Sequence, residues 1–121
     1  MKKMKVLIMC VLMLSFSNVN AQSRNFIVSG IERFFVQADG VAIVGLGMAN
    51  LPKDTCSFFT YHFKFDSTTE AGKNLLSVVM TAKISKSRTS VWYFPSSAVG
   101  KDETNGCGIN SLSVLDAVGL S

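Results

Sequence analysis

The sequence has few of the residues on which metal sites and enzyme active sites are usually built. Its 121 residues include three cysteines, one histidine and two prolines. Cys56, Cys107 and His62 would supply only three metal ligands, without paired spacing, which argues against a zinc site. No Gly-x-Ser-x-Gly turn accompanies the histidine, so a small secreted hydrolase has no support beyond the presence of Ser, His and Asp. The composition favours a non-catalytic protein without a metal.

Low-complexity runs, internal repeats, heptads and linkers are also missing, which predicts one compact domain. A dinucleotide-binding loop is excluded as well. Gly45-Leu46-Gly47 is not followed by a third glycine at the required spacing, and the next element is the turn Leu51-Pro52-Lys53-Asp54 instead of a helix. We therefore expect no cofactor.

The first 21 residues have the pattern of a signal peptide. Three lysines (Lys2, Lys3 and Lys5) precede an apolar run over residues 6–14, and Val19-Asn20-Ala21 supplies small residues for cleavage after Ala21. A run of about ten apolar residues is too short to span a bilayer of about 30 Å as a helix. Cys10 lies inside this run, does not follow a lipid-attachment pattern, and leaves with the signal. The protein is expected to be exported, to the periplasm or beyond, with residues 22–121 as a single domain.

Removal of the signal peptide changes the charge of the chain. The formal net charge of +4 includes the three signal lysines, so the mature chain has nine basic and eight acidic residues, a net charge of +1. Nucleic-acid binding requires a basic surface to offset phosphate repulsion. Export and a nearly neutral charge therefore argue against a nucleic-acid partner.

Cys56 and Cys107 are the two cysteines of the mature chain. In an exported protein they are most simply interpreted as one disulfide. About 100 residues bury only about two-thirds of their unfolded surface, so the core is small and an added restraint helps. A bridge that closes a loop of about 50 residues should stabilise the fold by about 4 kcal/mol in the chain-entropy model.

An amphipathic helix is predicted from Ser67 to about Ser85. Ser67-Thr68-Thr69-Glu70 has the form of a capping box. An apolar stripe then recurs at steps of three and four residues, at Ala71, Leu75, Val78, Val79 and Ala82. Lys73, Ser77 and Lys83 fall off this stripe. The polar side is either a solvent-exposed back or the lining of an oligomer's central channel.

Three strands are predicted before this helix. The first covers Phe26 to Gln37, with a bulge or bend near the doublet at Phe34, and Asp39-Gly40 predicts a hairpin turn. The second, Val41 to Ala49, is nearly all apolar, as expected of a strand that is covered on both faces or bent at its glycines. In the third, Cys56 to Phe65, aromatic residues recur at every second position.

Alternation in this third strand places aromatic residues on one face, which we assign to the core, and polar residues with Phe58 on the other. The aromatic face contains Phe59, Tyr61, Phe63 and Phe65; the opposite face contains Phe58, Thr60, His62 and Lys64. His62 is then expected to be a half-exposed strand residue.

After the helix, Lys86-Ser87-Arg88 turns the chain into a strand over Thr89 to Phe94. Val91 and Tyr93 share one face of this strand, and Ser90, Trp92 and Phe94 the other. One face is buried while the other still carries a large ring, which is either a ligand platform or a half-buried edge residue. A polar loop over 96–106, held by Cys107, precedes a final strand from about Ser111 to Leu120.

The element order is therefore strand, strand, strand, helix, strand, strand. A mainly β fold with one helix between the third and fourth of five strands matches an OB-fold, a small barrel whose helix closes one end. A mixed α+β sandwich with the same elements is the alternative. OB-folds bind nucleic acids or sugars, and the fold alone does not decide between these ligands.

Three segments resemble the B subunits of AB5-type bacterial toxins, in particular the branch of subtilase cytotoxin and the pertussis-like typhoid toxin. They are Phe26-Ile27-Val28-Ser29-Gly30-Ile31, Thr89-Ser90-Val91-Trp92-Tyr93-Phe94-Pro95 and Asp116-Ala117-Val118-Gly119-Leu120-Ser121. The resemblance implies an exported, non-enzymatic OB-fold subunit that forms a homopentameric ring. Such a subunit binds a host sialoglycan and delivers a catalytic A subunit carried on another chain.

In that branch, a serine of the first strand and a tyrosine of the strand after the helix hold the carboxylate and ring of a terminal sialic acid. The resemblance places these glycan-binding roles on Ser29 and Tyr93. The chemistry agrees, because a hydroxyl can donate to a carboxylate and a tyrosine ring can pack on the apolar side of a sugar. The alternative is an orphan exported OB-like domain that binds a protein partner or has a structural role, with Ser29 and Tyr93 merely packing.

Overall fold

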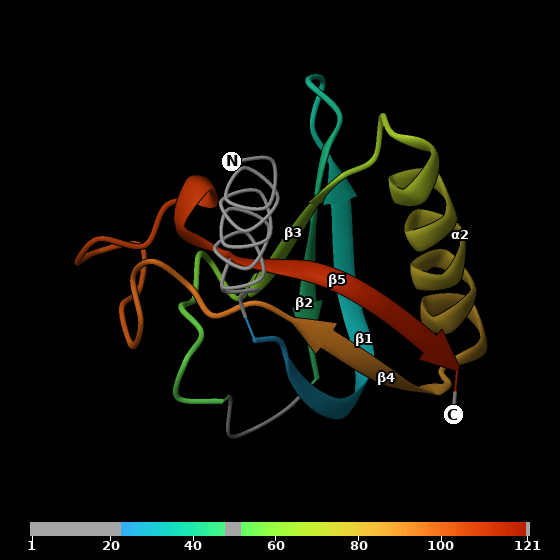
Figure 1. Ribbon diagram of the computed structural model, residues 1–121, viewed down its shortest axis with the longest axis horizontal. Helices are drawn as coiled ribbons and strands as arrows, with labels where there is room; N and C mark the ends of the chain where they lie inside the picture. The colour runs from blue at the N-terminus through green and yellow to red at the C-terminus, as the bar shows by residue number, and fades with distance from the viewer. Residues whose placement is uncertain (1–22, 48–51, 121) are drawn as a thin grey trace, which may run out of the picture.

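The computed structural model describes residues 23–47 and 52–120, as five strands, one α-helix and one short 3₁₀ helix (Figure 1). The predicted signal peptide lies outside the described residues. The elements are β1 (Asn25–Val36), β2 (Val41–Leu46), β3 (Phe63–Asp66), α2 (Glu70–Ser85), β4 (Arg88–Tyr93), η1 (Ile109–Ser111) and β5 (Ser113–Leu120). The predicted order of strands and helix is confirmed. Within these residues, no helix is long and apolar enough to cross a membrane.

The five strands form a closed barrel in the neighbour order β1-β2-β3-β5-β4, with β4 also paired to β1. All neighbours are antiparallel except β3 and β5, which are parallel. The last strand therefore inserts between two earlier ones, so the barrel is not a simple meander. Closure leaves none of the five described strands with a long unpaired edge on which another chain could add.

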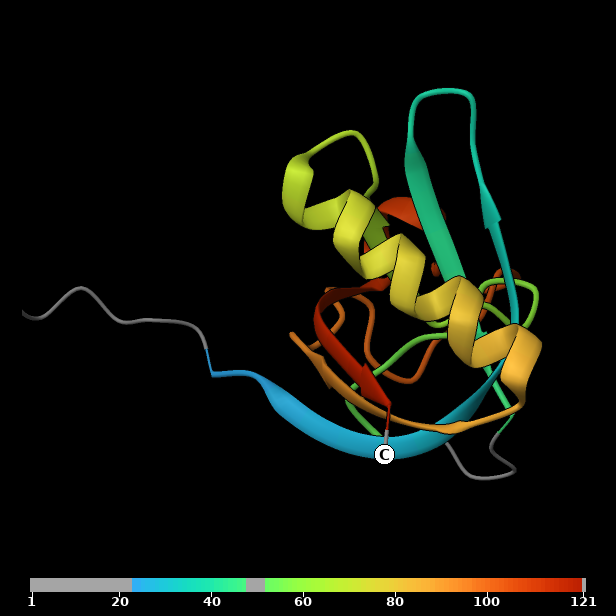
Figure 2. The same cartoon turned by 90° about the vertical axis from the view of Figure 1, so that its right-hand side faces the viewer.

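The long strand β1 belongs to two parts of this barrel. Residues 25–30 pair with β4, and residues 31–36 pair with β2. The register shifts between Ile31 and Arg33, a few residues before the predicted position at Phe34. A bulge bends its strand and increases the local twist. Figure 2 shows the result as a long, strongly curved β1 that sweeps under the barrel and then turns upward.

The predicted Asp39-Gly40 turn is confirmed and joins β1 to β2. The Gln37 amide donates to the Val41 carbonyl at 2.9 Å, and the Val41 amide donates to Asp39 Oδ1 at 3.1 Å. Gly40 has φ of 89°, in the left-handed region that glycine adopts without strain. A Cβ on Gly40 would also lie 2.1 Å from Thr68 Cγ2, so the turn and the segment before the helix need this glycine.

Strand β2 is buried on both faces, as its apolar sequence predicts. Ala42, Val44 and Leu46 face the barrel core, whereas Ile43 packs in a second apolar cluster outside the barrel. The strand ends at Leu46, and the rest of the predicted strand falls largely outside the described residues.

The prediction for the third strand is partly wrong. Only Phe63–Asp66 forms β3, because residues 58–61 make a tight turn in which Phe58 and Tyr61 exchange two backbone hydrogen bonds of 2.9 Å. Phe59 and Thr60 take positive φ values of 47° and 70°, as a two-residue hairpin turn requires. Phe63 and Phe65 are in the core as predicted, but Phe59 is 60% exposed and Tyr61 is half-buried.

The helix α2 begins two residues later than the capping box predicts. Thr69 is the N-cap, and its Oγ1 accepts from the Gly72 amide at 2.9 Å. Ser67 instead donates to the carbonyl of Gly40 at 2.6 Å. Gly72 packs so closely under the preceding turn that a Cβ would lie 1.7 Å from the Asp66 carbonyl oxygen. The predicted end at Ser85 is confirmed, with Lys86 in the left-handed conformation as C-cap.

One side of α2 covers the barrel core, where it packs against β1 and β5 (Figure 2). Val79 and Ala82 are fully buried, Leu75 and Leu76 are partly buried against the core, and Ala71 is exposed despite its place in the predicted stripe. The side chains predicted to lie off the stripe, Lys73, Ser77 and Lys83, are exposed.

Strand β4 starts one residue earlier than predicted, and β5 starts two residues later because η1 precedes it. The predicted alternation in β4 is confirmed. Val91 and Tyr93 point into the core, and Ser90 and Trp92 point outward and are half-buried.

A second apolar cluster lies outside the barrel around the predicted disulfide, which is confirmed. Cys56 and Cys107 are bonded, with Cα atoms 6.0 Å apart. The cluster contains Ile43, Cys56, Ala98, Cys107 and Leu112, with Val41, Phe58, Tyr61 and Ile109 packed against it. Backbone hydrogen bonds from Ser57 to Lys101, Ser96 to Asp54 and Gly100 to Thr55 hold the two loops together. The disulfide therefore fastens a loop layer onto the outside of β2.

Loss of this disulfide should destabilise the fold substantially. The bridge links residues 51 apart, and the chain-entropy model gives about 4 kcal/mol for a loop of this length. We expect the Cys56→Ala/Cys107→Ala variant to lose about this much free energy of unfolding, as measured by urea denaturation under oxidising conditions. Reducing agent should lower the midpoint of the wild type and leave that of the variant unchanged. Equal stabilities of the oxidised wild type and the variant would contradict this expectation.

Candidate functional site

The two predicted glycan-binding residues, Ser29 and Tyr93, both point into the barrel. Ser29 is 5% exposed and its hydroxyl donates to the neighbouring Gly30 carbonyl at 3.1 Å. Tyr93 is 1% exposed, its ring packs on Phe63 with centroids 4.9 Å apart, and its hydroxyl donates to Asp54 Oδ1 at 2.9 Å. Burial and the Asp54 carboxylate raise the pKa of Tyr93. In this conformation neither side chain presents a surface on which a sugar could pack.

Ser29 and Tyr93 are also not brought together. The register of β1 against β4 pairs Ser29 with Thr89, and Tyr93 with Asn25. Four residues along a strand correspond to about 13 Å. Their shared role in glycan binding therefore stays a prediction from the resemblance alone.

The large ring on the opposite face of β4 belongs to Trp92. It packs against Phe26 of β1 with ring centroids 4.9 Å apart, and Phe26 is 52% exposed. The guanidinium carbon of Arg24 lies 5.8 Å from the centroid of the Trp92 ring, and Arg24 Nη1 contacts Asp116 Oδ2 at 2.6 Å. A cation above an indole face is attracted by the ring quadrupole. The sequence leaves open which face of this strand is buried, so it does not single out Trp92.

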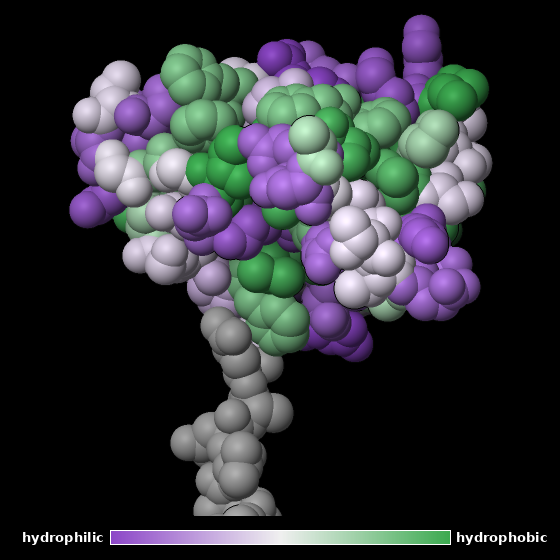
Figure 3. Space-filling model, turned by 90° about the horizontal axis from the view of Figure 1, so that it is seen from above, coloured by the Kyte–Doolittle hydropathy of each residue, from purple (hydrophilic) through white to green (hydrophobic). Residues whose placement is uncertain are grey.

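Other large apolar residues are exposed at scattered positions on the molecule. They are Phe35, Val36, Phe59, Met80, Ile84, Val99, Val114 and Leu120. On the face shown in Figure 3, green apolar residues are exposed among purple hydrophilic ones. Apolar residues exposed singly are normal on a soluble domain, so most of these need no functional explanation.

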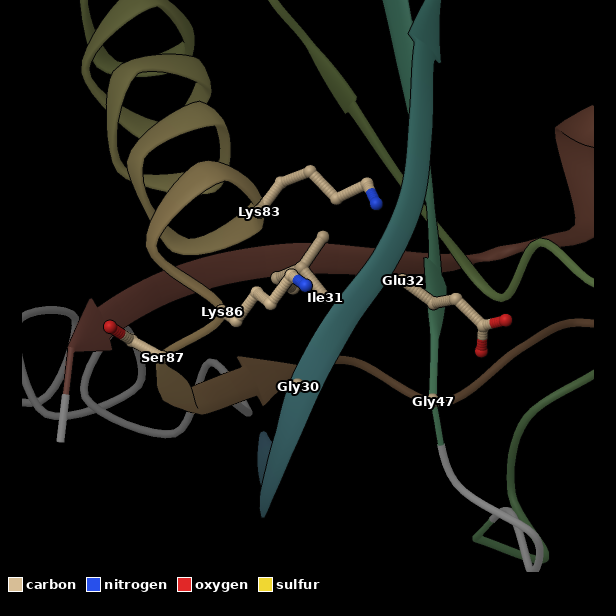
Figure 4. Close-up of a pocket in the computed structure, with 7 residues that line it drawn as sticks. All are labelled: Gly30, Ile31, Glu32, Gly47, Lys83, Lys86 and Ser87. Carbon is tan, nitrogen blue, oxygen red and sulfur yellow. The ribbon is translucent and has the colours of Figure 1, made fainter.

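A hollow lies where the end of α2 approaches β1, and we call it the helix-end cavity. Its volume is about 280 Å³, and its lining residues are Gly30, Ile31, Glu32, Gly47, Lys83, Lys86 and Ser87. In Figure 4, the Lys83 side chain reaches from the helix toward β1, Lys86 lies beside Ile31, and Glu32 is on the other side of the β1 ribbon. One of its lining residues, Gly30, directly follows Ser29 in the sequence.

The charged groups of the helix-end cavity suit a small anion. Glu32 contacts Arg33 at 3.3 Å, whereas the ammonium groups of Lys83 and Lys86 have no hydrogen-bond or ion-pair partner among the described residues. Lysines in the last turn of a helix also interact favourably with the helix dipole, which is a structural reason for them to be there. Two ammonium groups beside one cavity are able to bind a carboxylate, and the sequence gives no signal that they adjoin β1.

His62 is buried, and the prediction of a half-exposed strand residue is wrong. It is 4% exposed, and Nδ1 accepts from the Leu46 amide at 3.4 Å. Burial and then the positive charge of Arg33 lower the pKa of His62 from 6.5 to about 4. The turn at residues 58–61, which the alternating pattern conceals, places His62 inside. Among residues 23–47 and 52–120, no group of three or more His, Cys, Asp or Glu side chains is arranged to hold a metal ion.

No protein family, curated protein or solved structure matches this chain. The features that bear on function are therefore the barrel, the Phe26–Trp92 ring pair, the helix-end cavity and the resemblance of the three short segments.

His62 should make the fold less stable in mild acid. Its folded-state pKa is below its unfolded value, so the unfolded chain binds the extra proton between pH 6.5 and about 4, and stability falls as pH falls through that range. The contribution is at most about 1.4 kcal/mol per pH unit. We expect His62→Asn, whose Oδ1 can still accept from Leu46, to show a smaller loss of unfolding free energy between pH 7 and pH 5 than the wild type. Equal losses would contradict this assignment.

Proposed function

We propose that this protein is an exported, non-catalytic subunit with an OB-fold, which binds host sialylated glycans, assembles into a homopentameric ring, and delivers a catalytic subunit on another chain. The observation that carries the proposal is the barrel itself. Five strands closed in the order β1-β2-β3-β5-β4, with α2 between β3 and β4, fit the small Greek-key barrel that binds oligosaccharides and oligonucleotides. The nearly neutral mature charge favours the sugar over the nucleic acid.

The helix-end cavity supports an acidic glycan as the ligand. Its two lysines adjoin Gly30, one residue from the serine to which the resemblance assigns the carboxylate. A carboxylate bound between Lys83 and Lys86 would gain charge-assisted hydrogen bonds without any change in the buried Ser29 hydroxyl.

Two exposed apolar residues on α2 support assembly. Met80 and Ile84 are one helical turn apart on the side away from the barrel core, and Ile84 is 80% exposed. In a ring of copies, this side of the helix, with Lys73 and Ser77, would face neighbouring subunits or the central channel.

The second candidate function is an orphan domain that binds a protein partner or has a structural role. The burial of Ser29 and Tyr93 favours it, because both side chains then have structural roles in the core. A gene for an ADP-ribosyltransferase or protease beside the gene for this chain would favour the toxin-like function instead.

Glycan binding is tested directly on an array with the purified mature protein. We expect binding to sialylated glycans that is lost when the terminal sialic acid is removed, and no binding at all would contradict the proposal. Because their side chains are buried, we expect Ser29→Ala and Tyr93→Phe to keep the binding. Tyr93→Phe should lose about 1 kcal/mol of stability, since it removes one partly buried hydrogen bond. Loss of binding in these variants while they remain folded would assign the sugar contact to Ser29 and Tyr93.

Ring assembly is tested by light scattering on the same protein. We expect a mass of several subunits at micromolar concentration, and Ile84→Lys to shift the mass toward the monomer because it places a charge on the exposed side of α2. The exposed Val99→Lys, on the loop layer, is the matched control and should leave the mass unchanged. A monomeric wild type would count against the ring.

A further inference from the structure

The barrel face that OB-folds commonly use for ligands is largely covered in this protein. In that fold the exposed side of strands 2 and 3, with adjoining loops, binds oligonucleotides and oligosaccharides. Here Ile43 on the outer side of β2 is fully buried under the disulfide-linked loop layer. The Lys64 ammonium of β3 is also bound, to the carbonyl of Asn110 at 2.6 Å. What stays open there is a hollow of about 230 Å³ beside Val41, Lys64 and Val114, so an extended ligand needs a longer face.

The opposite side of the barrel offers such a face, on the outer surface of β1, β4 and β5. The strand registers place the outward side chains in rows: Phe26 beside Trp92 and Ala117, Val28 beside Ser90 and Gly119, and Gly30 beside Arg88. We call these residues the outer face. In Figure 1, the three strands lie side by side, and Figure 2 shows α2 on the other side of them.

Two positions of the outer face are glycines. A Cβ added to Gly30 or to Gly119 would meet no atom within 4 Å, so the space above both glycines is open. The aromatic rings of Phe26 and Trp92 stand at one end. At the other end, Gly30 also lines the helix-end cavity with its two lysines. Phe26 and Gly30 are four residues apart on β1, so the rings and the helix-end cavity lie about 13 Å apart along this strand.

The polar groups at the aromatic end contact one another. Arg24 lies over the Trp92 ring and contacts Asp116, which sits where the register of β4 against β5 shifts. The rings, the guanidinium and the carboxylate thus lie together at one exposed spot. Aromatic faces pack on the apolar side of a sugar ring, and guanidinium and carboxylate groups hydrogen-bond its hydroxyls.

We propose that the outer face is the binding surface for an extended acidic oligosaccharide, with a sugar ring packed on Phe26 and Trp92 and an acid group directed toward Lys83 and Lys86. This proposal rests on the proposed glycan binding and specifies its site. The open positions at Gly30 and Gly119 admit an extended chain, and the two lysines at one end match an acid group. A protein partner would use the aromatic rings but would not require the open space above the two glycines.

The test measures binding of an acidic glycan from the array to the purified protein by calorimetry. Trp92→Ala removes the platform, and Gly119→Val fills the open space above Gly119 with a side chain that suits a strand. Phe59→Ala is the control, because Phe59 is an exposed aromatic residue on the turn outside the outer face. Circular dichroism and thermal unfolding confirm that each variant is folded.

We expect Trp92→Ala to weaken binding by about tenfold, as loss of one stacking contact implies. Gly119→Val should weaken binding to a similar extent because its side chain blocks the ligand, and Phe59→Ala should bind as the wild type does. If the wild type binds the glycan and folded Gly119→Val and Trp92→Ala bind equally well, the site is wrong while the proposed function stands. If the wild type binds no glycan, both proposals are overturned.

Discussion

The bend in β1 between Ile31 and Arg33 is the constraint on which the barrel depends. One strand of twelve residues pairs with β4 through its first half and with β2 through its second. Without the register shift, a straight β1 could not join both neighbours, and the ring of strands would stay open with exposed edges. The shift also sets the boundary between the two outer surfaces of the barrel, because Gly30 lies just before it and Arg33 just after.

The loops cover one of these outer surfaces and leave the other exposed. The Cys56–Cys107 bridge fastens residues of two long loops over β2, so that Ile43 is buried from outside while Val44 is buried from inside. This layer adds a second apolar cluster to a domain of about 100 residues, whose barrel core is small. It also covers the side of the barrel beside β2 and leaves β1, β4 and β5 as the open side, so the same interaction that stabilises the fold restricts where a ligand can bind.

Neighbouring residues of β4 show how closely function depends on strand direction. Tyr93 and Trp92 are adjacent in sequence, yet Tyr93 packs on Phe63 in the core and Trp92 packs on Phe26 outside. Alternation separates the two rings, but it does not say which of them is inside. Tyr93 is the inner ring because it contacts Phe63 of β3 and donates a partly buried hydrogen bond to Asp54. Phe63 and Asp54 are both distant from Tyr93 in sequence.

The sequence by itself determined the order of strands and helix, the hairpin at Asp39-Gly40, the helix end at Ser85 and the disulfide, because each follows from local periodicity, turn chemistry or the presence of only two mature cysteines. Only the tertiary structure decided the turn at Phe59 and Thr60, because neither residue is a glycine or asparagine that would predict a turn. The burial of His62 follows from this turn. The same is true of the meeting of Lys83 and Lys86 with Gly30, and of Arg24 with Trp92 and Asp116. These groups come together because the barrel closes through pairings between distant strands, and a local sequence pattern carries no information about such pairings.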